Sequence, residues 1–183
     1  EIVGGPSVLA RTRPRPGALR VVALEEPRAD GVVAHVLQPS RLCAPSVVLA
    51  TDFDEVRVDG APWAWFDGRT VFLPDRPGRY RVETQRHAGG APPHVRRTGA
   101  PLTGCRWLPD RRELVLETAR APGRPAGLPW TAVLAGPVPA AIDNGEVVPV
   151  AELQLPDVAT EAAAEAGGVL IRFGPGTTTV RYR

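Results

Sequence analysis

Two Asp-Gly pairs lie within the segment Glu55 to Leu73, each flanked by residues typical of β-strands. They are Asp59-Gly60 and Asp67-Gly68. A two-residue type I′ turn needs positive φ at both central positions, which Asp-Gly tolerates well. The segment is therefore expected to form three antiparallel strands joined by two tight turns. This pattern of strands and turns constrains the class of fold more than any other feature of the chain.

Turns of this kind also fix the register of the expected meander. Val58 is expected to face Ala61, Val56 to face Trp63, Trp63 to face Phe72, and Trp65 to face Thr70. The face that these residues share is almost wholly apolar, so it is expected to be the core face. The opposite face brings Phe66 beside Arg57 and Arg69, which makes these three residues a candidate contact surface.

Short Val-rich runs separated by Gly, Pro and Asp continue on both sides of the meander, a spacing typical of β-sandwiches. We expect an all-β chain, an antiparallel β-sandwich built as two sandwich-like lobes at residues 16–85 and 95–183. The two lobes either stand alone or share one core. Residues 1–15 are expected to form an N-terminal arm or linker, and residues 86–94, rich in Gly, Pro and His, to link the lobes.

One short helix is expected near 157–166, capped by Asp157 and stopped by Gly167-Gly168. Cys43 and Cys105 are the only cysteines of the chain. They are expected to be buried, either joined in a bridge or separate as two small apolar side chains.

Composition excludes some classes of function. The net charge is only +2, which argues against a nucleic-acid partner, and no apolar stretch approaches the length of a membrane helix. All 22 basic residues are Arg, and the bias towards Ala, Gly, Pro, Arg and Val indicates a GC-rich bacterial genome, with a thermophile as an alternative source. The chain has no Met, so we expect a processed or excised piece of a larger protein.

The motifs of common catalytic and metal sites are missing from the sequence. It has no GxSxG, P-loop or GxGxxG motif, and its three histidines lack the spacing of zinc ligands. No catalytic residue, metal or cofactor is therefore assigned. Asp52, Asp54 and Glu55 form an acidic run that leaves a calcium site as an alternative, although the spacing is not that of an EF-hand loop.

Aromatic residues give the remaining lead, because exposed rings can stack on the apolar faces of sugars. Trp63 and Trp65 are two positions apart and would lie on the same face of a strand, as a sugar-stacking pair would. The expected register, however, places both rings in the core. Trp107 shares a strand face with Cys105 and is also assigned to the core. Trp130 follows a Gly-Leu-Pro loop and fits either place, so it joins the candidate ligand-binding residues.

The string VRVDGAPWAWFDGRTVFLPDRPGRYRVE resembles the immunoglobulin-like or accessory β-sandwich modules of bacterial carbohydrate-active enzymes. The resemblance covers residues 55–83 and implies a non-catalytic module. Such a module binds carbohydrate or positions a neighbouring catalytic domain, and we expect it at the cell surface or outside the cell. Two alternatives stay open, namely a purely structural or protein-interaction domain of a larger assembly, and a small hydrolase whose site forms only in space.

Overall fold

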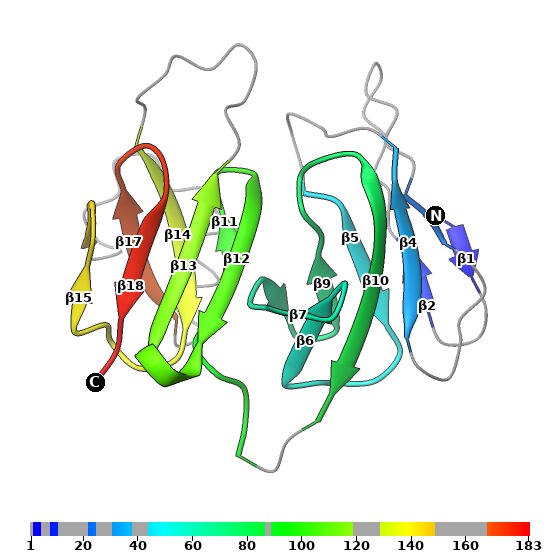
Figure 1. Cartoon of the computed structure of the whole chain (residues 1–183), viewed down its shortest axis with the longest axis horizontal. Helices are drawn as coiled ribbons and strands as arrows, with labels where there is room; N and C mark the ends of the chain where they lie inside the picture. The colour runs from blue at the N-terminus through cyan, green and yellow to red at the C-terminus, as the bar shows by residue number, and fades with distance from the viewer. Residues whose placement is uncertain are drawn as a thin grey trace. The chain divides into compact units, whose positions relative to one another are not determined.

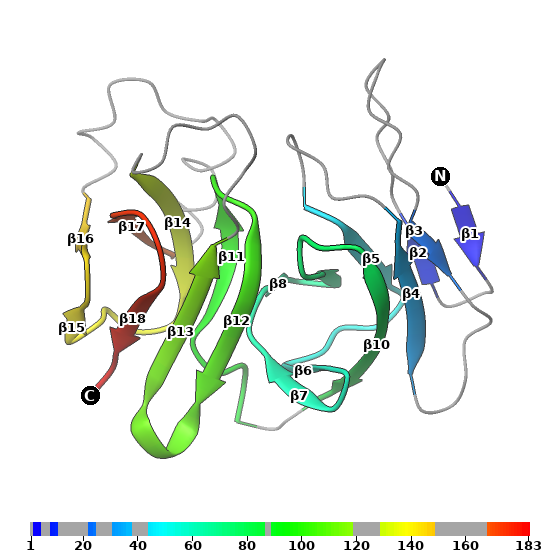
Figure 2. The same cartoon turned by 45° about the horizontal axis from the view of Figure 1, so that its top comes forward.

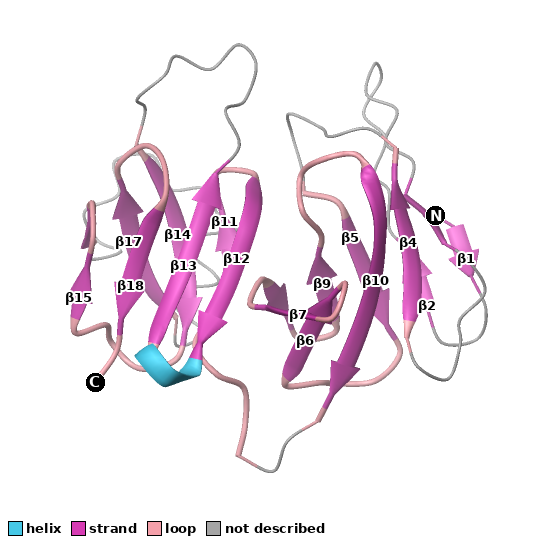
Figure 3. Ribbon diagram, in the orientation of Figure 1, coloured by secondary structure: helices cyan, strands magenta, loops and turns pink. Residues whose placement is uncertain are grey.

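The computed structural model describes residues 2–4, 8–10, 22–24, 31–37, 44–86, 89–118, 129–148 and 168–183. Strands dominate these residues, and the one helical element among them is the short 3-10 turn η1 (Figure 3). Two compact units divide the chain, Glu1–Ala91 and Pro92–Arg183 (Figure 1). Each unit contains two antiparallel sheets.

The first unit contains sheets 1 and 2. Sheet 1 has the strand order β1 (Ile2–Gly4), β2 (Val8–Ala10), β5 (Ser46–Leu49), β9 (Thr70–Phe72) and β8 (Phe66–Asp67). Sheet 2 has the order β3 (Val22–Leu24), β4 (Val32–Val36), β10 (Gly78–Gln85), β6 (Glu55–Val58) and β7 (Ala61–Trp63).

The second unit contains sheets 3 and 4, and Figure 2 shows their edge strands most clearly. Sheet 3 has the order β11 (His94–Thr98), β14 (Trp130–Ala135), β17 (Val169–Phe173) and β16 (Gly145–Val147). Sheet 4 has the order β12 (Leu102–Leu108), β13 (Glu113–Thr118), β18 (Thr178–Arg181) and β15 (Ala141–Ile142), with η1 (Pro109–Arg111) between β12 and β13.

The prediction of an all-β chain is confirmed, but that of a two-lobed β-sandwich is wrong. The described strands are divided among four small sheets of four or five strands each, two in each unit. Strand spacing along a sequence shows where strands form, whereas the partner of each strand is set by long-range pairing. The helix expected at 157–166 lies outside the described residues.

The first turn of the meander is confirmed in detail. Asp59 has φ 53° and Gly60 has φ 77°, as a type I′ turn requires. Val58 pairs with Ala61 and Val56 with Trp63, which is the expected register.

The second hairpin has a different register. Asp67 pairs with Thr70 and Phe66 pairs with Val71, so the two central residues are Gly68 and Arg69 instead of Asp67 and Gly68. Gly68 alone of these has positive φ, at 55°, which is the pattern of a type II′ turn. The physical gain is burial: Phe66 now lies beside Val71, and both side chains are buried.

The three expected strands also do not share one sheet. The chain leaves sheet 2 after β7 and enters sheet 1 at β8, so Trp63 and Phe72 do not pair in a ladder. Instead the Trp63 indole N–H donates to the carbonyl oxygen of Phe72 at 2.6 Å. Trp63 is 7% exposed, which confirms its expected place in the core.

Trp63 provides the first test of this packing. We expect Trp63→Ala to lower the free energy of unfolding by about 3–5 kcal/mol, because a large buried ring is removed. Trp63→Phe keeps a ring but leaves the Phe72 carbonyl without the indole donor, and we expect it to cost about 1–3 kcal/mol. Denaturant melts measure both, and a loss below about 1 kcal/mol for Trp63→Ala would contradict the buried assignment.

Candidate functional site

The residues predicted to bind a ligand are divided among three sheets. Arg57 lies on β6 of sheet 2, where its Nε donates to Glu55 at 3.1 Å. Phe66 and Arg69 belong to the β8–β9 hairpin of sheet 1, and Phe66 is only 2% exposed. Trp130 lies in the other unit, and it is 5% exposed. A ligand-binding role for these four residues stays a prediction, and neither ring presents an open face.

All of the chain's four Trp, two Tyr and four Phe residues lie in the part that the structure describes. None of them is exposed: Phe72 and Trp107 are half-buried, and the others are buried. The Trp130 indole packs against Phe173 with ring centroids 4.5 Å apart and donates its N–H to the carbonyl oxygen of Gly174 at 3.0 Å. Eight of the ten aromatic rings are therefore buried, and two of the indoles also donate to backbone carbonyls.

A network of polar contacts lies where the chain crosses between sheets 3 and 4. The chain passes from β15 to β16 through Asp143-Asn144, and from β17 to β18 through residues 174–177. These two crossings bond to each other, and we call the set of residues that joins them the crossover clamp. Its members are Asp143, Asn144, Gly174, Pro175, Thr178 and Arg181.

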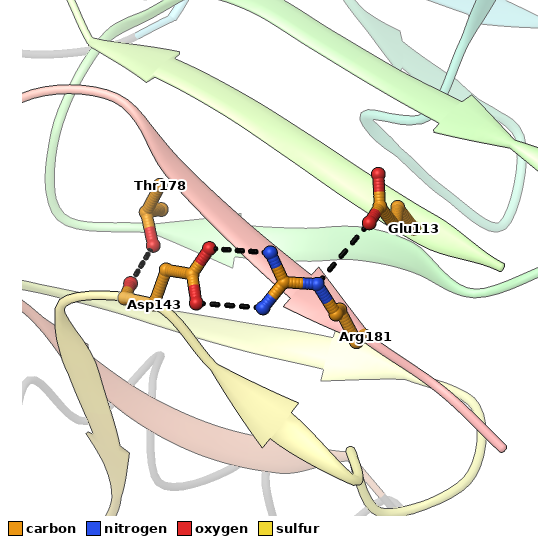
Figure 4. A network of polar contacts seen from close by, with 4 residues as sticks. All are labelled: Glu113, Asp143, Thr178 and Arg181. Atoms are coloured by element: carbon orange, nitrogen blue, oxygen red, sulfur yellow. Dashed lines mark hydrogen bonds and ion pairs between the residues drawn. The ribbon is translucent and has the colours of Figure 1, made fainter. Parts of the chain in front are cut away.

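Backbone and side-chain hydrogen bonds both contribute to the crossover clamp. The Asp143 N–H donates to Thr179 O at 2.8 Å, and the Gly174 N–H donates to Asn144 O at 2.7 Å. The Thr178 hydroxyl donates to the backbone oxygen of Asp143 (Figure 4). These bonds satisfy backbone groups that have left the sheet ladders, which makes the crossings well defined.

Arg181 is the charged centre of this site. Its two terminal nitrogens donate to both carboxylate oxygens of Asp143 at 2.8 and 2.9 Å, and its Nε donates to Glu113 at 3.1 Å (Figure 4). Hydrogen bonds to Asp143 and then to Glu113 raise the pKa of Arg181. The fork of the guanidinium is thus already occupied by protein carboxylates, which suits a structural bridge better than the capture of an anionic ligand.

The crossover clamp also lacks the arrangement of a nucleophile. A catalytic hydroxyl needs a neighbouring base to take its proton, but the Thr178 hydroxyl donates to a backbone carbonyl. Among the described residues, no group of three or more His, Cys, Asp or Glu side chains could hold a metal ion. In the acidic run that left calcium as an alternative, Asp52 lies 4.0 Å from Arg69 and Glu55 lies 3.1 Å from Arg57.

Beside the clamp, the outer face of sheet 4 carries a mixed surface, which we call the charged face of sheet 4. It consists of Arg106, Glu113, Val115, Glu117, Thr179 and Arg181. The half-buried Val115 pairs with Arg106 on one side and with Thr179 on the other. Arg106 forms an ion pair with Glu117 at 2.8 Å, so charged side chains surround the apolar side chain of Val115.

Sequence reasoning did not find Arg181 or its partners. Asp143 is 38 positions from Arg181 and Glu113 is 68 positions away, so no local spacing relates them. The alternation in the last strand would have placed Arg181 on an outer face, but its partners follow only from the pairing of β18 with β13 and β15.

Cys105 is fully buried, as expected, while Cys43 lies outside the described residues, so their bridge stays a prediction. In the residues that the structure describes, no helix is long and apolar enough to cross a membrane. Comparison of the chain with family models, curated proteins and solved structures finds no match.

Tyr182 follows β18 and packs edge-on against Trp107, with ring centroids 5.7 Å apart. Its hydroxyl is buried without a hydrogen-bond partner among the described residues. Burial, and then the charge of a Cys105 thiolate, raise the pKa of Tyr182. Tyr80 is the matched contrast, because its buried hydroxyl donates to Arg76 O at 3.0 Å.

This contrast predicts opposite effects of the two Tyr→Phe changes. Tyr182→Phe should leave the free energy of unfolding unchanged or raise it, whereas Tyr80→Phe should lower it by about 0.5–1.5 kcal/mol. Above about pH 10 the unfolded chain loses the Tyr182 proton while the folded chain keeps it, so stability falls as pH rises. Tyr182→Phe should make that fall shallower in denaturant melts, and an unchanged slope would contradict the assignment.

Proposed function

We propose that this chain is a non-catalytic protein-interaction module of a larger assembly, which holds a neighbouring domain or a partner protein in place. One observation carries the proposal: eight of the ten aromatic rings are buried and the other two, Phe72 and Trp107, are half-buried, so no ring offers a fully exposed face for the stacking of a sugar. The polar sites of the second unit add support, because Arg106 and Arg181 pair with carboxylates and the Thr178 hydroxyl donates to a backbone carbonyl.

The charged face of sheet 4 is the docking surface that we assign to this function. Protein interfaces combine an apolar centre with a polar rim, and Arg is enriched in them. Val115 supplies such a centre, and the pairs Arg106–Glu117 and Arg181–Glu113 supply the rim. Because both signs of charge alternate there, a partner needs complementary charges of both signs, and its association rate should fall as salt rises.

Val115→Arg tests this assignment, with Val33→Arg as the matched control. Val33 is also half-buried and pairs with an Arg, in its case Arg81 of β10 in sheet 2. A photo-crosslinking residue is placed at Thr179, and the chain is expressed in its source cells. We expect Val115→Arg to abolish the crosslinked product and Val33→Arg to leave it unchanged.

A glycan array on the purified chain provides the opposing test. We expect no binding to any oligosaccharide at millimolar concentration. Without a fully exposed ring, the contact free energy at one site would scarcely exceed the free energy lost on association. Specific glycan binding that survives Val115→Arg would overturn the proposed function and restore the carbohydrate-binding alternative.

A further inference from the structure

Asn144 is the only asparagine of the chain, and glycine follows it. It lies in the crossover clamp with φ 55°, in the left-handed region where Asn is one of the few tolerated side chains. Its amide Nδ2 donates to Pro175 O at 3.1 Å, and its backbone oxygen accepts from Gly174 at 2.7 Å. The amide and the backbone of Asn144 therefore both bond to the β17–β18 crossing.

The glycine at 145 is required by close packing. A Cβ there would lie 2.8 Å from the Phe173 ring and 2.9 Å from Arg172 O, which is closer than real Cβ atoms approach. Local structure thus favours Asn at 144 and requires Gly at 145 for separate reasons. Together they place the pair most prone to succinimide formation at the crossing, because glycine offers no side chain to hinder attack by its own nitrogen.

We propose that Asn144 is a site of spontaneous deamidation whose rate is set by opening of the crossover clamp. The Gly145 nitrogen attacks Cγ of Asn144, a new C–N bond closes a succinimide, and the side-chain amide nitrogen leaves as ammonia. Water then opens the ring at either carbonyl to give Asp or isoaspartate. The only co-reactant is water, and no oxidant is needed.

The folded geometry holds this reaction back. Gly145 pairs with Phe173 in the β16–β17 ladder, and the Asn144 amide is bonded to Pro175 O. The Gly145 nitrogen can approach Cγ only after the amide leaves Pro175 and the end of β16 leaves the ladder. Such local openings need less free energy than global unfolding, so they set the rate in the native protein.

Reaction at this position would loosen the clamp permanently. A carboxylate at 144 would lose the donor that now binds Pro175 O and would place a second negative charge beside Asp143. Isoaspartate would also lengthen the backbone where Gly145 meets Phe173. Deamidation is thus a one-way change that frees the edge strand β16.

The test is a time course of deamidation by peptide mass spectrometry, on the folded chain and on the chain in denaturant. We expect the folded chain to react at least about tenfold more slowly, as the opening equilibrium requires. Arg181→Gln breaks the bonds to Asp143 and should speed the reaction in the folded chain. Arg81→Gln, which breaks a 3.0 Å ion pair with Glu83 in the other unit, should not.

Each outcome decides the proposal. Equal rates in the folded and denatured chains, or equal acceleration by both variants, would overturn control by the clamp. Absence of deamidation in the denatured chain would overturn the site itself. Asn144→Asp and Asn144→Gly complete the test: the first mimics the product and should melt at a lower temperature than the second, which keeps positive φ without a charge.

Discussion

Within each of the two units, a hydrogen bond from a buried indole N–H to a backbone carbonyl ties together segments that are distant in the sequence. Trp63 donates to Phe72 O at 2.6 Å, which joins β7 of sheet 2 to β9 of sheet 1. Trp130 donates to Gly174 O at 3.0 Å, at the point where the chain leaves sheet 3 for sheet 4. A buried carbonyl needs a partner, so each bond removes a desolvation cost while its ring fills the core.

The polar contacts of the second unit likewise provide hydrogen-bond partners for backbone groups. A chain that crosses between sheets leaves its ladders twice, and the crossover clamp satisfies the backbone groups that are released. Arg181 adds charge to this arrangement by binding Asp143 and Glu113 together. The site is consequently a support for the fold, and the proposed interaction surface lies beside it on sheet 4.

The sequence alone predicted those features of the fold that depend on interactions between residues close together in the chain. The type I′ turn at Asp59-Gly60 and the burial of Trp63 were both predictable, because turn chemistry and alternation act over a few residues. The second turn was not, since Gly68-Arg69 competes with Asp67-Gly68 for the centre of the turn, and the register that forms places the buried Phe66 beside Val71. The division into four sheets, and the partners of Arg181, arise from contacts between distant residues.

Exchange of the four indole N–H protons, followed by NMR, tests this account most directly. We predict that the Trp63 and Trp130 protons exchange only on global unfolding, because both are buried and bonded to backbone oxygens. The half-buried Trp107 should exchange much faster. Rapid exchange of Trp63 or Trp130, or a shift of either signal on addition of oligosaccharides, would show that these rings are accessible and would contradict the account.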